Sequence, residues 1–166
     1  MLAQTFGHLR RESEDRVAVH FERVYDYGQE ELWAALTEPE QLRGWLGEAD
    51  VDLRVGGRIV IRFGDGDDEI ASGAIRELDP PRLLEYEWTF LGESDSVLRL
   101  ELAPRGNGTL LILDHRRLTP SVAVGYSAGW HAHLDRLEGL ATGERVDWDE
   151  RFAELVAQYR QAAERL

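Results

Sequence analysis

Residues 109–140 read TLLILDHRRLTPSVAVGYSAGWHAHLDRLEGL, and the hydrophobic period changes in the middle of this stretch. Residues 109–118 are rich in branched apolar side chains and follow a turn, which is typical of a strand. Beyond Pro120 the large apolar residues Tyr126, Trp130, Leu134 and Leu137 recur at helical spacing. The stretch therefore predicts a strand followed by one long amphipathic helix over 122–140, which a glycine at position 143 would end.

The part of the chain before this stretch contains a series of predicted strands with no helix between them. Apolar and polar residues alternate in 59–63, 70–78, 84–90 and 98–102. Turn-forming residues separate these segments at 64–68, 79–81 and 105–108. The pattern predicts an antiparallel meander rather than a parallel sheet with crossover helices.

The N-terminal part predicts one more strand and two short helices. Residues 17–21 alternate as a half-buried strand does, and Glu30–Leu36 has helical spacing. Pro39 should end that helix and begin a second short one that runs through Trp45. Residues 1–15 are polar, and we interpret them as an N-terminal arm outside the domain formed by residues 16–143.

Residues 144–166 predict an additional C-terminal helix docked on that domain. Phe152, Leu155, Val156 and Tyr159 form one apolar stripe, and burying such side chains contributes roughly 1.5–3 kcal/mol each. A homodimer is the alternative use of this stripe.

Composition excludes several classes of protein. The chain has 166 residues, which fits one domain, and its net charge of −13 opposes binding to nucleic acid. It has no cysteine, so a disulfide framework and a thiolate zinc site are excluded. No apolar run is long enough to span a membrane, and no signal peptide is apparent. We expect a cytoplasmic protein, and the use of arginine for every basic residue indicates a bacterial source.

Two motifs suggest chemistry that their context does not support. Residues 125–129 match the G-x-S-x-G pattern of serine hydrolases, but they lie in a predicted helix, and the last histidine follows Ser127 by only six residues. His131 and His133 are two residues apart, so on a helix one should point partly toward the core and the other toward solvent. We therefore expect no metal, no cofactor and no catalytic serine.

Aromatic and polar residues at inward-facing positions predict a ligand-binding cavity. Their phase on the strands and on the long helix places them on facing surfaces, and large aromatic side chains with a few polar groups are typical of an apolar pocket. The predicted cavity residues are Trp45, Ile61, Phe63, Tyr86, Trp88, Leu113, His115, Tyr126, Trp130 and His133.

The order of elements, with several motifs, resembles the START-like (SRPBCC) superfamily and, more narrowly, the homologues of the activator of the heat-shock-protein-90 ATPase. The supporting motifs are LWAALTEPE at 32–40, Trp45, VGGR at 55–58, Gly73, DPPRLL at 79–84, Trp88, and Gly129-Trp130 with Leu134 and Leu137. The resemblance implies an α+β helix-grip fold, in which a curved antiparallel sheet wraps around the long C-terminal helix and two short helices separate the first two strands.

Three functions remain open at this stage. The leading hypothesis is a non-catalytic module that binds a small apolar or aromatic ligand in the cavity. The second is an enzyme of cyclase or hydratase type that uses His115 or His133 as general acid or base beside Tyr126. The third, which the resemblance implies, is a chaperone-linked or stress-associated interaction module.

Overall fold

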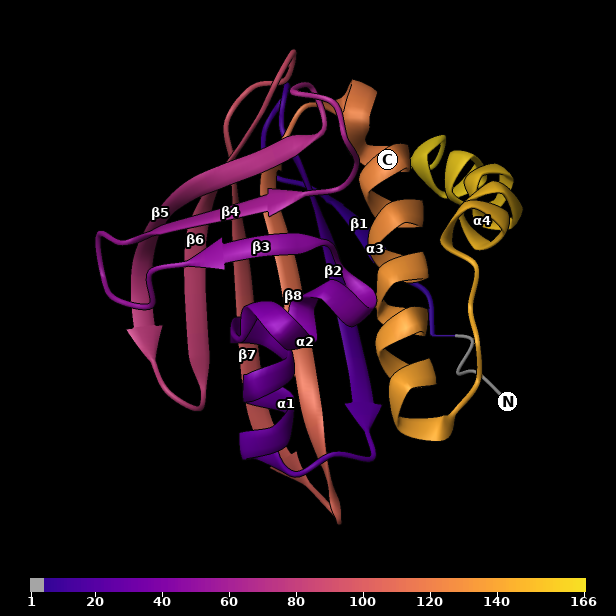
Figure 1. Cartoon of the computed structure of the whole chain (residues 1–166). Helices are drawn as coiled ribbons and strands as arrows, with labels where there is room; N and C mark the ends of the chain where they lie inside the picture. The colour runs from indigo at the N-terminus through magenta and orange to yellow at the C-terminus, as the bar shows by residue number, and fades with distance from the viewer. Residues whose placement is uncertain (1–4) are drawn as a thin grey trace.

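The computed structural model describes residues 5–166, which form eight strands and four helices (Figure 1). The elements are β1 (His8–Arg11), β2 (Val17–Tyr25), α1 (Gln29–Thr37), α2 (Pro39–Trp45), β3 (Glu48–Val51), β4 (Arg58–Arg62), β5 (Ile70–Asp79), β6 (Leu83–Phe90), β7 (Ser96–Arg105), β8 (Gly108–Leu118), α3 (Pro120–Thr142) and α4 (Trp148–Ala163).

All the strands belong to one antiparallel sheet with the order β1-β2-β8-β7-β6-β5-β4-β3. From β3 to β8 each strand pairs with the next, so the predicted meander is confirmed. Register shifts between Ile75 and Glu77 on β5 and between Val17 and Val19 on β2 bend the sheet. At Gly73 on β5 a Cβ would lie 1.6 Å from the carbonyl oxygen of Glu87, so the close approach of β6 requires glycine.

The helix α3 lies along the inner face of this curved sheet (Figure 1). It begins with Pro120 at its first turn and ends at Gly143, whose φ of +79° is the left-handed conformation that glycine adopts readily. Leu134 and Leu137 of its inner stripe are fully buried. The structure is the α+β helix-grip fold predicted above.

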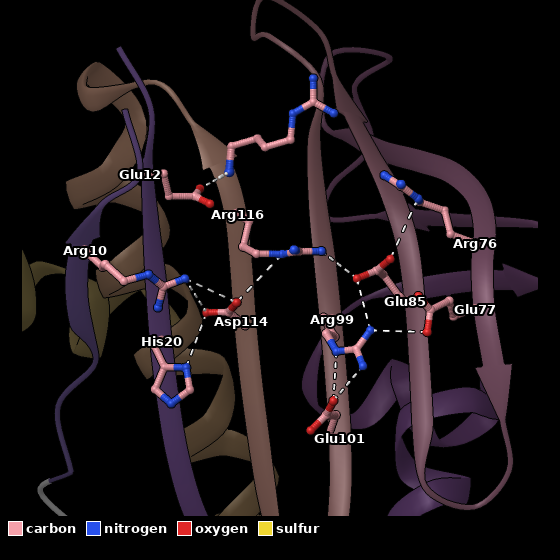
Figure 2. A network of polar contacts seen from close by, with 11 residues as sticks. Arg10, Glu12, His20, Arg76, Glu77, Glu85, Arg99, Glu101, Asp114 and Arg116 are labelled. Carbon is pink, nitrogen blue, oxygen red and sulfur yellow. Dashed lines mark hydrogen bonds and ion pairs between the residues drawn. The ribbon is translucent and has the colours of Figure 1, made fainter. Parts of the chain in front are cut away.

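The outer face of the sheet carries a row of charged residues, shown in Figure 2. Neighbouring strands of the sheet, in the order β2-β8-β7-β6-β5, each contribute one residue to this row, and each residue lies directly opposite the next: His20, Asp114, Arg99, Glu85 and Glu77. Asp114 with Arg99 and Arg99 with Glu85 are pairs of opposite charge, which contribute roughly 0.2–1 kcal/mol each, whereas Glu77 and Glu85 are both carboxylates and share the guanidinium of Arg99. With this face polar and internally paired, the apolar face of the sheet is the one that faces α3.

Glu85 is the most enclosed member of the network in Figure 2. Its side chain is only 5% exposed, and three arginines surround its carboxylate: Arg116 at 2.6 Å, Arg99 at 3.3 Å and Arg76 at 3.7 Å. These ion pairs join strands β5 to β8 on the outer side.

The N-terminal segment differs from the arm that its polar composition suggested. Residues His8–Arg11 form the edge strand β1 and pair with Val17–His20 of β2. In addition, the backbone N–H of Gly7 donates to the hydroxyl of Tyr159 on α4, at 2.8 Å. The strand β1 itself has a single half-buried apolar residue, Leu9, so it arises from backbone pairing and gives no alternating pattern.

The helix α4 packs beside the N-terminal half of α3, because the linker after Gly143 runs back along that helix (Figure 1). The side chain of Asp147 caps α4 by accepting a hydrogen bond from the N–H of Glu150 at 3.0 Å. Leu155 and Tyr159 from the apolar stripe are buried. None of the helices within residues 5–166 has the length and apolar character that crossing a membrane requires.

Candidate functional site

A cavity of about 700 Å³ lies between the inner face of the sheet, α3 and α4. Ring side chains dominate its wall: Phe63, Trp88, Phe90, Tyr126, Trp130, Trp148 and Phe152. The lining also contains one histidine and several charged side chains: His133, Glu69, Glu93, Arg136 and Asp149. We call this space the aromatic pocket. Its volume lies within the roughly 300–1,000 Å³ typical of small-molecule sites.

The structure brings five of the predicted cavity residues together in the aromatic pocket. They are Phe63, Trp88, Tyr126, Trp130 and His133. Trp88 and Trp130 meet edge to face, with ring centroids 5.6 Å apart. His133 lies near both Phe63 and Trp148, with centroids 5.8 and 5.2 Å away.

The other five predicted residues are packed in the core and do not line this cavity. Trp45, Ile61, Tyr86, Leu113 and His115 are at most 4% exposed. The strand alternation identifies the inner face of the sheet, but it does not say which inward side chains reach the cavity and which are sealed in the core. Trp45, for example, donates its indole N–H to the carbonyl of Ala35 at 2.8 Å, inside the helical corner.

His115 has both ring nitrogens engaged behind the pocket wall. The indole N–H of Trp130 donates to its Nδ1 at 2.9 Å, so the proton of the neutral ring lies on Nε2 and faces Ser96 Oγ at 2.8 Å. Burial lowers the pKa of His115 to about 3. This histidine is therefore a neutral structural group that supports Trp130.

His133 is held in the opposite tautomer. Its Nδ1 donates to the carbonyl of Trp45 at 3.0 Å, which leaves Nε2 as an acceptor. The residue is 9% exposed and lines the pocket, and no other group within residues 5–166 bonds to Nε2. Burial lowers its pKa to about 4, opposed by the bond to Trp45. The pocket therefore contains one neutral imidazole with a free lone pair.

Tyr126 connects the pocket wall to the loop between β6 and β7. Its hydroxyl accepts the indole N–H of Trp88 at 2.8 Å and donates to the carboxylate of Glu93. Burial and the Glu93 carboxylate both raise the pKa of Tyr126. The hydroxyl therefore stays protonated and holds Glu93 at the edge of the pocket.

Several lining residues were missing from the sequence-based set. Trp148, Asp149 and Phe152 come from α4, which the pattern places outside the central domain. No sequence signal directs that helix toward the cavity. Phe90, by contrast, shares the alternation phase of Trp88 and could have been included.

His131 corrects the expectation that one histidine of the pair faces solvent. His131 is fully buried, because Tyr159 and Arg151 of α4 cover it, and the hydroxyl of Tyr159 lies 2.8 Å from its Nδ1. The two imidazoles point to different surroundings, as their spacing requires. Among the described residues, no cluster of three or more histidine or acidic side chains is placed to hold a metal ion.

Acidification is expected to destabilise the fold through the three buried imidazoles. Burial lowers the pKa to about 3 in His115 and to about 4 in His131 and His133, whereas the unfolded chain binds these protons near pH ~6.5. The stabilisation is therefore complete above that pH and falls as the pH drops toward the folded values, by up to about 1.4 kcal/mol per pH unit for each imidazole.

Urea unfolding between about pH 7 and pH 5.5, above the usual range of carboxyl titration, measures this effect. A free energy of unfolding that stays constant across the interval would contradict the burial of three neutral histidines.

The sheet curved around α3, with a ligand-sized pocket between sheet and helices, defines the helix-grip class of small α+β proteins. Within that class, the chain belongs to the family of activator of Hsp90 ATPase homolog 1-like proteins, whose model matches residues 26–142. No curated protein matches the chain.

Solved structures share the fold over most of the chain. CalU16 from Micromonospora echinospora is 28% identical with a TM-score of 0.81, and the match covers 97% of this chain and 99% of that one. MLL2253 from Mesorhizobium loti is 26% identical with a TM-score of 0.66, covering 78% and 99%. DynU16, described as a protein in the dynemicin biosynthetic locus, is 26% identical with a TM-score of 0.66, and the match covers 76% of this chain and 48% of DynU16.

Proposed function

We propose that this protein binds a small molecule with a flat apolar body in the aromatic pocket, without catalysing a reaction on it. The observation that carries the proposal is a cavity of about 700 Å³ walled by seven aromatic side chains and by His133, whose Nε2 has no partner within the described chain. Rings of this kind bury large apolar area and favour offset or edge-to-face contact with a ligand ring. The DynU16 relative, from a biosynthetic locus, supports a role with a small molecule.

The three acid–base residues of the enzyme hypothesis favour binding over catalysis. A general base acts best when its pKa lies near the working pH, and the pKa of His133 is lowered to about 4. Tyr126 has a raised pKa and its proton is committed to Glu93. His115, the other acid–base residue of the enzyme hypothesis, lies behind Trp130 with both nitrogens engaged.

The interaction-module hypothesis has weaker support. Apart from Leu53 and Val55, which share the loop after β3, the exposed large apolar residues of the described chain lie on separate elements, as in Val24 on β2, Leu91 after β6 and Leu140 near the end of α3. Protein-binding surfaces generally need a contiguous apolar patch. The outer face of the sheet is instead covered by ion pairs (Figure 2).

A space-filling variant tests the proposed site. Gly125 lines the pocket on α3, and a Cβ added there meets no atom within 4 Å. Gly125 is exposed, so Gly125→Trp should add an indole to the pocket wall and narrow the cavity without disturbing the fold, whereas Gly125→Ala should leave it open. Binding of the neutral fluorophore N-phenyl-1-naphthylamine, followed by titration, should be saturable in the wild type and in Gly125→Ala.

Gly125→Trp should weaken that binding at least about tenfold, a loss of about 1.4 kcal/mol. Thermal unfolding of both variants checks that the fold is kept. Equal affinity in Gly125→Trp and Gly125→Ala would place the binding site elsewhere and overturn the proposal. The core residue Leu113 is unsuitable for this test, because it is fully buried and does not line the pocket.

A further inference from the structure

The indole N–H and phenol O–H donors of the pocket wall are used inside the protein. Trp88 donates to Tyr126, Tyr126 to Glu93, Trp130 to His115, and Trp148 to the carbonyl of Gly129 at 3.3 Å. The donor that the aromatic pocket still offers a ligand is the guanidinium of Arg136, of which one nitrogen donates to the carbonyl of Gly44 at 3.4 Å.

The acceptors, by contrast, face the pocket. His133 is nine-tenths buried, and its Nε2 lone pair has no partner among the described residues. Glu69, Glu93 and Asp149 add three carboxylates to the lining, against the single guanidinium of Arg136. One Glu93 oxygen accepts from Tyr126, and one Glu69 oxygen accepts from the N–H of Gly66, so each of these carboxylates keeps further acceptor capacity.

The aromatic faces have the same electrostatic preference as the carboxylates. The face of an indole or phenyl ring is the negative end of its quadrupole and attracts cations, most strongly where water is displaced. Trp148 and Phe152 stack with ring centroids 4.8 Å apart, next to Asp149 at the start of α4. Ring faces and carboxylates thus occur together on one wall.

We infer that the ligand carries a basic amine on its apolar body, and that the ammonium group is held by the carboxylates, the aromatic faces and the Nε2 of His133. This inference rests on the proposed function and specifies its ligand class. The lining offers an ammonium group three carboxylates and one imidazole nitrogen as acceptors, whereas it offers an anionic ligand the single cation of Arg136.

Three matched probes of one ring system test the charge preference. These are 1-naphthylmethylamine, which is protonated at neutral pH, the neutral 1-naphthylmethanol, and the anion 1-naphthylacetate. We expect the amine to bind about tenfold more tightly than the alcohol and the acetate to bind most weakly. The difference should shrink as salt is added, because the carboxylates are at or near the surface.

Two double variants test whether the preference for the protonated amine arises in the aromatic pocket. Glu93→Gln/Asp149→Asn removes two lining charges and keeps their shape, so it should weaken the amine several-fold more than the alcohol. Glu40→Gln/Glu150→Gln changes the net charge equally at exposed residues outside the lining, and it should leave the ranking of the three probes intact.

The outcomes separate this inference from the proposed function. If the alcohol binds in the Gly125-sensitive site and the amine binds no more tightly, the amine inference is wrong and the pocket proposal stands. Tighter binding of the acetate would show that Arg136 governs the charge preference and would also overturn the inference. If none of the three probes binds, the proposed function itself fails.

Discussion

Replacing Asp135 by alanine is expected to lower the free energy of unfolding by about 3–5 kcal/mol, the usual effect of breaking a buried ion pair. Asp135 is completely buried on α3, and one carboxylate oxygen accepts from Arg23 of β2 at 2.5 Å. The other accepts from Arg151 of α4 at 2.6 Å. A single carboxylate therefore joins the sheet to both C-terminal helices.

The expected loss of unfolding free energy comes mainly from Arg23, because its buried guanidinium cannot turn toward water when Asp135 is removed. Its side chain is 3% exposed, its Nε already has no hydrogen-bond partner among residues 5–166, and its remaining nitrogen donates to the carbonyl of Thr5. Arg151 is 15% exposed and also pairs with Glu154, so it can turn toward water. Leaving a guanidinium buried and unpaired is the costly part of the change.

Urea unfolding of Asp135→Ala and of the double variant Arg23→Met/Asp135→Leu measures the cost of leaving Arg23 unpaired. Replacing both partners by apolar side chains is often neutral or stabilising, so the double variant should recover most of the loss. A double variant no more stable than Asp135→Ala would show that the damage is lost packing rather than an unpaired charge. A loss under about 1 kcal/mol in Asp135→Ala would contradict the buried pair altogether.

The pattern of apolar residues predicted the architecture because each element of it has one buried face. Alternation along Leu84–Phe90 and the helical stripe from Tyr126 to Leu137 correspond to β6 and α3 almost as expected. The edge strand β1 was missed because four mostly exposed residues carry no such pattern. The strand β1 forms because its backbone pairs with β2, and the residue types in the sequence do not predict that pairing.

The pocket was predicted only in part, for a related reason. Periodicity identifies which face of a strand is inward, and so it grouped Leu113 and His115 with Trp88. Whether an inward side chain reaches a cavity or is sealed in the core depends on where α3 crosses the sheet. The contribution of Trp148 and Phe152 depends on the return path of the linker before α4, which no local pattern specifies.

The sequence of β2 contains a signal from which the buried ion pair could have been predicted. Arg23 occupies the same alternation phase as Phe21 and Tyr25, so a charged residue stands on the inward face of β2. A charge at such a position requires a buried partner. Asp135, which lies on α3 between the buried residues Leu134 and Leu137, is the side chain that supplies it.

Trp130 is expected to be the most sensitive aromatic residue of the pocket wall. Its side chain is 3% exposed, it packs edge to face on Trp88 at 5.6 Å, and its N–H satisfies the buried Nδ1 of His115. Truncating a buried tryptophan to alanine usually costs about 3–5 kcal/mol. Because water from the pocket can enter the space, we expect Trp130→Ala to lie near the lower end, about 3 kcal/mol.

Trp130→Phe separates the two contributions of this side chain. Phenylalanine keeps most of the ring packing but cannot donate to His115, so its expected loss is the cost of one unsatisfied buried acceptor, about 1–3 kcal/mol. Urea unfolding gives both values, and titration with N-phenyl-1-naphthylamine should show weaker binding in Trp130→Ala than in Trp130→Phe, since only alanine removes a ring from the pocket. Equal stability losses in the two variants would mean that the hydrogen bond to His115, and not the packing against Trp88, is what the indole contributes. Wild-type stability in Trp130→Ala would show that α3 closes on the sheet without it.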